Sequence, residues 1–201
     1  MTQNKTVLVI LLVFALLLGA AYLLYTRLSS SITPNQLSVQ GEQPQAQDSA
    51  DDTSDTDSEE PQPVPAPDFT VYDGEGNEVH LSDYLGKPVV MNFWASWCGP
   101  CQMEMPDFQE KYEELGGEVQ FLMINMTSGR ETLETAQEFI SEQGYTFPVF
   151  YDTDTDAAIT YGAYSLPTTY FIDAEGNAVA QAMGAIDGET LQIGIDMIYE
   201  K

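Results

Sequence analysis

The centre of the chain reads Val89-Val90-Met91-Asn92-Phe93-Trp94-Ala95-Ser96-Trp97-Cys98-Gly99-Pro100-Cys101. Residues 89–94 are a nearly continuous apolar run, which is typical of a central strand covered on both faces of a sheet. Residues 98–115 have a helical pattern, which we expect to be interrupted at Pro106 because a proline inside a helix removes a hydrogen bond. Cys98 and Cys101 are the only two cysteines in the chain. A Cys-x-x-Cys pair between a strand and a helix predicts a redox couple that opens and closes.

Strands and helices alternate on both sides of this stretch. Upstream, residues 69–81 have the pattern of a β-hairpin around a Gly-rich turn. Downstream, we expect strands over 119–126 and 146–151, helices over 131–143 and 157–161, a hairpin over 168–183, and a last helix from 187 or 188. This order predicts an α/β fold, with a mixed central sheet flanked by helices and built from residues 68–201.

The N-terminal part of the chain predicts a membrane anchor. After a short tail, 1–6, residues 7–25 give 19 consecutive positions without a charge. As a helix they would span about 28 Å, close to the thickness of a hydrocarbon core. The alternative is a cleaved signal peptide, whose apolar region would be shorter and followed by a small-residue cleavage site. The short tail is the easier part to keep in the cytoplasm, so we expect the C-terminal bulk on the extracytoplasmic side of the cell membrane.

Residues 26–67 have the composition of a disordered linker. The stretch from Ser29 to Pro67 is rich in Ser, Thr, Gln, Pro and Asp, with eight acidic residues and no Lys or Arg. Such a segment buries too little apolar surface to offset its ordering entropy. The domain that follows, 68–201, has 24 acidic and four basic residues, a formal charge of −20. Nucleic acid is therefore excluded as a partner, because phosphates need a basic surface.

Three groups of residues together resemble the thioredoxin superfamily: the stretch Asn92 to Cys101, Pro106, and Ser165-Leu166-Pro167-Thr168-Thr169-Tyr170. Within it, the chain resembles the membrane-anchored extracytoplasmic thiol–disulfide oxidoreductases of the ResA/TlpA type. The anchor, the N-terminal hairpin and an inserted helix–strand unit over about 131–151 favour that branch. The resemblance covers 68–201.

This resemblance implies a thioredoxin-like fold that works without a cofactor. It also implies dithiol–disulfide exchange with disulfide-containing proteins outside the cytoplasm, supplied by a membrane thiol donor. Members of this branch reduce disulfides, often those of apocytochromes c in cytochrome c maturation.

The chemistry of the pair follows from its place at the start of a helix. Unpaired N–H groups and the helix dipole favour the thiolate of Cys98, which is the form that attacks a disulfide. Cys101, one turn on, would then resolve the mixed disulfide. Between them, Gly99 allows a partner backbone to approach and Pro100 suits an early helix position.

Two alternatives for the cysteine pair stay open at this point. A metal site would need about four N or S ligands. The chain offers two cysteines and a single histidine, His80, so we predict no metal. A static disulfide is the other alternative, although a bridge that closes so small a loop adds little stability.

Glu104 is the candidate proton carrier. It lies three residues after Cys101, on the same helical face. If that face packs inward, the carboxyl would resist ionisation and could move protons near neutral pH. The superfamily's better-known acid lies at the position of Asn92, and the resemblance places the ResA-like acid at Glu104 instead. The alternative is an exposed glutamate on a very acidic protein.

The second part of the predicted site is the loop before residue 168. The resemblance implies a cis peptide bond at Pro167, beside the cysteines, and a backbone at Leu166 free to pair with an extended substrate. The alternative is an ordinary trans proline in a turn. Trp97 is expected at the rim of the site, where it could contact a substrate.

Three functions compete for this chain. The leading one is a membrane-tethered reductase of extracytoplasmic disulfides. A peroxiredoxin-like peroxidase would need a lone peroxidatic cysteine in a Pro/Thr setting, which the sequence lacks. A non-enzymatic binding or chaperone module is the third, and the intact Cys-x-x-Cys pair argues against it.

Overall fold

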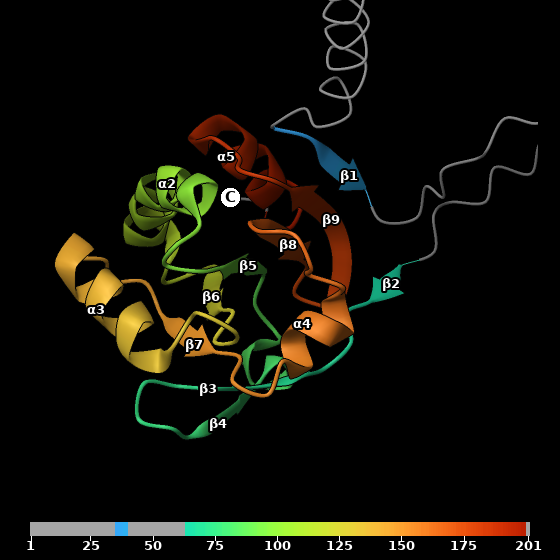
Figure 1. Cartoon of the computed structure of the whole chain (residues 1–201). Helices are drawn as coiled ribbons and strands as arrows, with labels where there is room; N and C mark the ends of the chain where they lie inside the picture. The colour runs from blue at the N-terminus through green and yellow to red at the C-terminus, as the bar shows by residue number, and fades with distance from the viewer. Residues whose placement is uncertain (1–34, 40–62, 200–201) are drawn as a thin grey trace, which may run out of the picture. The chain divides into compact units, whose positions relative to one another are not determined.

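A mixed β-sheet forms the centre of the residues that our computed structural model describes, 35–39 and 63–199 (Figure 1). In chain order its strands are β1 Leu37–Val39, β2 Val64–Pro65, β3 Thr70–Tyr72, β4 Glu78–His80, β5 Val89–Trp94, β6 Gln120–Asn125, β7 Val149–Tyr151, β8 Thr168–Ile172 and β9 Asn177–Met183. Across the sheet they run β1-β9-β8-β5-β6-β7-β3-β4, and β2 also pairs with β9. The central strands β5, β6 and β7 are parallel, whereas β8 is antiparallel to β5 and to β9.

Helices cover both faces of this sheet (Figure 1). They are the 3-10 helix η1 Leu81–Tyr84, α2 Gly99–Leu115, α3 Leu133–Gln143, α4 Asp156–Tyr161 and α5 Gly188–Asp196. The buried side chains of α2, α3 and α5 join one apolar cluster, and those of α4 and η1 join another. The sheet therefore separates two cores.

Strand β5, which leads to the cysteines, is buried along its whole length and so positions the segment that follows it. Val90 and Trp94 belong to the cluster under α2, while Met91 and Phe93 belong to the cluster under α4. Successive side chains of a pleated strand point to opposite faces of the sheet. The run 89–94 is apolar almost without interruption because both faces are covered. By the same alternation Asn92 lies on the α2 face, and it is also fully buried.

The structure confirms the expected thioredoxin-like α/β fold. The N-terminal hairpin is β3–β4, whose strands are antiparallel, and the inserted helix–strand unit is α3–β7. The predicted interruption at Pro106 is wrong, because α2 continues through it. Pro106 removes only the bond that its own nitrogen would give, and the fully buried neighbours Met105 and Phe108 hold the helix on the sheet.

Strands β1 and β2 fall inside the range 26–67 that the composition assigns to a linker. Most of that range, and the whole apolar run 7–25, lies outside the described residues. Among the helices of residues 35–39 and 63–199, none is both long and apolar enough to cross a membrane. The anchor therefore stays a prediction from the sequence.

Candidate active site

The two cysteines form a disulfide at the N-terminal end of α2. Cys98 is the N-cap residue, and its Sγ accepts a hydrogen bond from the backbone N–H of Cys101 at 3.2 Å. Gly99 and Pro100 are the first two helical residues, where the missing N–H of proline leaves no internal bond unmade. The sulfur of Cys98 thus receives one backbone N–H group and lies at the positive end of the helix dipole, and both favour a thiolate.

A cavity of about 500 Å³ opens beside Cys98. The structure brings four other predicted residues to its wall, namely Trp97, Gly99, Pro100 and Leu166. The remaining lining residues are Met126, Ser128, Arg130, Ala163 and Tyr164. Cys98 is 4% exposed and lines this cavity, whereas Cys101 is fully buried and does not. A disulfide that enters the cavity therefore meets Cys98 and not Cys101.

The loop before β8 forms part of the wall of this cavity. The peptide bond between Leu166 and Pro167 is cis, as the resemblance implies, so the trans alternative is excluded. Within the described residues, the backbone N–H and C=O of Leu166 make no backbone hydrogen bond. A free backbone edge in a cavity wall can pair with an extended segment of a substrate protein.

Glu104 lies one turn after Cys101 and is 2% exposed, which excludes the alternative of a surface glutamate. Its Oε1 accepts a hydrogen bond from Asn92 Nδ2 at 2.8 Å, and its Oε2 accepts one from the backbone N–H of Ile186 at 3.0 Å. Burial raises the pKa of Glu104 to about 8, against the lowering effect of these two bonds. The carboxyl is therefore neutral at pH 7 and close to its titration.

Glu104 does not line the cavity at Cys98. It lines a separate cavity of about 240 Å³, together with Met103, Asp107 and the loop 185–187. A carboxyl between the cysteine pair and a second opening can exchange a proton with solvent on the side away from a bound substrate. Its part in catalysis stays a prediction.

Asn92 is a further site residue, at the position where the superfamily's better-known acid lies. Besides its bond to Glu104, its Nδ2 donates to Thr169 Oγ1 at 3.0 Å, and its Oδ1 has no partner among the described residues. Exchange of the amide oxygen and nitrogen would turn Oδ1 toward Glu104, where it can accept the proton of the neutral carboxyl. The one polar residue in the apolar run 89–94 was the signal for such a buried pair.

A second buried glutamate braces the loop before the cysteines. Glu131 is 4% exposed. Its Oε1 accepts hydrogen bonds from the backbone N–H of Ser96 and from Asn125 Nδ2, both at 3.0 Å, and its Oε2 accepts one from Ser96 Oγ at 2.8 Å. Sequence periodicity assigned Glu131 to the following helix, yet α3 begins only at Leu133. No pattern in the sequence marked it.

Replacing Glu131 with alanine should lower the free energy of unfolding by about 2–4 kcal/mol, because it leaves buried donors without acceptors. Glu131→Gln should recover most of the loss, since its oxygen can serve the two N–H donors while its amide donates to Ser96 Oγ. Urea unfolding of the three proteins measures this difference. Equal destabilisation by both variants would contradict the assigned bonds.

Residues 35–39 and 63–199 contain no group of three or more His, Cys, Asp or Glu side chains arranged to hold an ion. The site therefore consists of a disulfide, a buried carboxyl and a cavity.

Comparison with protein families and known sequences agrees with this geometry. The model of the AhpC/TSA family matches residues 64–181. The thiol–disulfide oxidoreductase ResA of Bacillus thuringiensis strain Al Hakam is 39% identical over 130 residues, which is 63% of this chain and 72% of that protein. ResA of Geobacillus thermodenitrificans is 36% identical over 136 residues, 66% of this chain and 75% of that protein.

Solved structures show the same likeness. A crystal structure of a thiol:disulfide interchange protein DsbE from Chlorobium tepidum has a TM-score of 0.60 and 29% identity, over 66% of this chain and 94% of that one. A DsbF homologue from Corynebacterium diphtheriae has a TM-score of 0.61 and 30% identity, over 69% of this chain and 88% of that one.

Proposed function

This chain belongs to the AhpC/TSA family and is a thiol–disulfide oxidoreductase, and we propose that it works as a membrane-tethered reductase of protein disulfides outside the cytoplasm. The observation that carries the proposal is the disulfide between Cys98 and Cys101, with the first sulfur at a helix N-terminus beside an open cavity and the second buried behind it. A static bridge would need neither the cavity nor the neutral carboxyl nearby.

In the proposed reaction the reduced pair gives two electrons to a client disulfide. The Cys98 thiolate attacks one client sulfur, a mixed disulfide forms, and the other client sulfur leaves as a thiolate. Cys101 then loses its proton and attacks Sγ of Cys98, which releases the second client sulfur. The client gains two electrons, its two thiolates take up the equivalent of the Cys101 proton and one proton from solvent, and the protein is left with the Cys98–Cys101 disulfide. The ionised form of Glu104, whose share grows as the pH approaches its pKa of about 8, is the buried group able to accept the proton of Cys101.

The location rests on the sequence and on the relatives. The apolar run 7–25 is long enough to anchor the chain. The resemblance to the ResA/TlpA branch supports an extracytoplasmic domain, a membrane thiol donor that restores the dithiol, and apocytochrome c among the clients. Protease treatment of intact cells should then cleave the domain, and alkaline washing should leave the full chain in the membrane fraction. Release by the wash would contradict the anchor.

A redox titration against glutathione tests the direction of electron flow. We expect a potential nearer to that of thioredoxin, about −270 mV, than to that of DsbA, about −120 mV, on the analogy of the Gly-Pro dipeptide. A value close to −120 mV would make the protein an oxidant. The same preparation should show no sustained turnover of hydrogen peroxide, since the two cysteines are one helical turn apart rather than set up as a lone peroxidatic thiol.

A further inference from the structure

The wall of the cavity at Cys98 contains one basic side chain, Arg130. The carbon at the centre of its guanidinium lies 3.8 Å from the centre of the Trp97 ring, in a cation–π contact. Trp97 precedes Cys98 directly and is 46% exposed. A positive charge therefore lies in the wall of the same cavity as Cys98, the residue that a client disulfide must reach.

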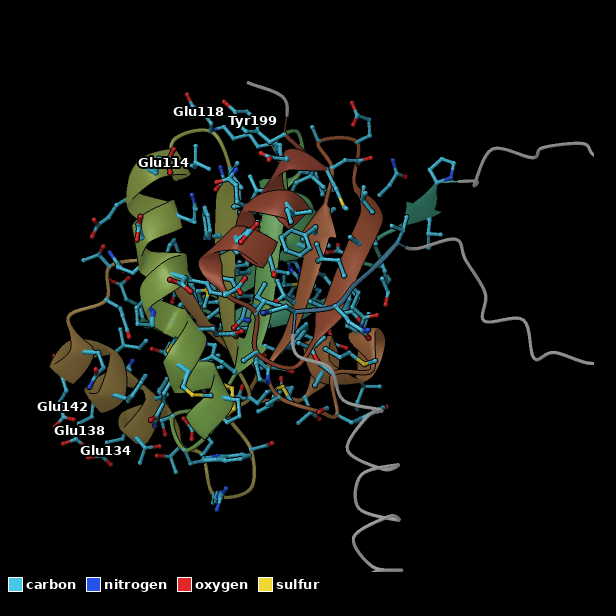
Figure 2. All side chains as sticks on the ribbon, turned by 90° about the horizontal axis from the view of Figure 1, so that it is seen from above. Glu114, Glu118, Glu134, Glu138, Glu142 and Tyr199 are labelled. Atoms are coloured by element: carbon cyan, nitrogen blue, oxygen red, sulfur yellow. A yellow bond between two sulfur atoms is a disulfide. The ribbon has the colours of Figure 1, made fainter. Side chains whose placement is uncertain are left out.

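The guanidinium of Arg130 forms no ion pair with an acidic side chain of the described residues, so its positive charge is available to a ligand. The ion pair found within residues 35–39 and 63–199 joins Lys111 to Glu114 and does not involve Arg130. The acidic residues nearest in sequence point elsewhere. Glu131 faces Ser96 in the interior, and Figure 2 shows Glu134, Glu138 and Glu142 along the outer side of α3.

The backbone on both sides of Arg130 is held in place by the neighbouring residues. Gly129 has a φ of 65°, a left-handed turn that glycine adopts without strain, and Glu131 is tied to Ser96 by two hydrogen bonds. Ser96 is the residue before Trp97, so one carboxylate holds both partners of the stack. The stack covers a face of the guanidinium and leaves its in-plane N–H donors available.

We propose that Arg130 is a specificity residue that binds a carboxylate of the client, an Asp or Glu side chain close to the cysteine that Cys98 attacks. A cavity of about 500 Å³ is roughly 10 Å across, which is about three residues of extended chain. The carboxylate therefore lies within about two positions of that cysteine. This inference rests on the proposed function and specifies which client segment the cavity accepts.

Charge complementarity supports this occupant over others. The domain carries a formal charge of −20, so acidic segments are repelled from most of its surface. Among the described residues, Arg130 is the one basic side chain that lines this cavity. Its planar guanidinium can bind a carboxylate through two parallel hydrogen bonds. The apolar side chains of Met126, Tyr164 and Leu166 complete the wall for the rest of the segment.

Matched disulfide peptides test the inference. Each peptide has one internal disulfide, with alanine around the first cysteine except for a single Glu or Gln placed one or two positions before or after it. The second-order rate constant of reduction by the full-length reduced protein is measured for each pair. We expect the wild type to reduce the Glu peptide about tenfold faster than the Gln peptide at one or more positions.

Variants assign this preference to Arg130. In Arg130→Gln the Glu and Gln peptides should react at equal rates, and Arg130→Lys should keep only part of the difference, since lysine lacks the planar fork. Lys111→Gln makes the same change in net charge away from the cavity and should keep the full preference. Raising the salt concentration should reduce it.

Equal rates for Glu and Gln peptides in the wild type, at every position, would overturn this inference and leave the proposed reductase intact. A preference that survives in Arg130→Gln would overturn it as well. If the protein oxidises the reduced peptides instead, the proposed direction is wrong, and the same Glu-to-Gln ratio then tests Arg130 in the oxidising reaction.

Discussion

Replacing Cys98 with serine should lower the rate of client reduction by more than about 10³-fold, because the hydroxyl stays protonated and is a poor nucleophile toward sulfur. Replacing Cys101 with alanine should have a different effect. Cys98 then still attacks, but nothing resolves the mixed disulfide, so each molecule of protein captures one client and stops. Non-reducing electrophoresis followed by mass spectrometry of the captured species separates the two outcomes.

The contrast between the two variants tests the assigned roles. Cys98 lines the cavity, whereas Cys101 is fully buried, so the capture should occur through Cys98 alone. Mixed disulfides in the Cys98→Ser variant would reverse the roles. If Cys98→Ser binds clients and supports their folding as well as the wild type does, the non-enzymatic module is favoured. Matching circular dichroism spectra provide the control for folding.

Glu104→Gln should make the protein more stable at alkaline pH. The pKa of this carboxyl rises from an ordinary value of 4.5 to about 8 on folding, chiefly through burial. Below pH 4.5 the folded and unfolded chains both hold the proton, so the shift contributes nothing. Between 4.5 and 8 the unfolded chain releases the proton and the folded chain keeps it, so the free energy of unfolding falls as the pH rises.

The size of this effect is largest above pH 8, where it reaches up to about 5 kcal/mol. The glutamine variant removes it and can keep the local bonds: its oxygen can accept from Ile186, and its amide can donate to Asn92 Oδ1 once the Asn92 amide is turned around. Urea unfolding at a series of pH values measures the difference between variant and wild type, which should grow from pH 5 to pH 9. A constant difference would contradict the raised pKa.

The same variant should change the pH profile of client reduction. We expect a titration near pH 8 in the wild-type rate that is absent in Glu104→Gln, with a rate about tenfold to a hundredfold lower at pH 7. Glu110→Gln is the matched control, since it removes an exposed carboxylate from the same helix and should leave both the profile and the stability unchanged.

The sequence predicts the residues whose chemistry or local pattern is distinctive. The apolar run 89–94 determines a buried central strand, and the cysteine pair after it determines the start of α2. The inward face of that helix places Glu104, because residues three apart share a face. In each case the signal lies within one or two turns of the chain.

The remaining site residues depend on contacts between distant segments. Arg130 meets Trp97 across 33 positions of sequence, and their contact depends on the buried Glu131 beside them. Ile186 reaches Glu104 only after the whole sheet is assembled. Strand β1 is not predicted because its three residues lie in a polar stretch, and their partners, the backbone of β9 and the apolar cluster under Leu37, come from distant parts of the chain. Such pairings leave no periodic pattern.

Strands β1 and β2 also protect the sheet from other molecules. They pair with β9 at Ala180, Gln181 and Ala182 and at Asn177 and Ala178, which closes most of that outer edge. An uncovered edge strand is a template for the backbone of another chain and a starting point for aggregation. A fragment designed for crystallisation should therefore begin before Asn35, since one that begins at residue 63 would lose β1 and expose an alanine-rich edge to self-association.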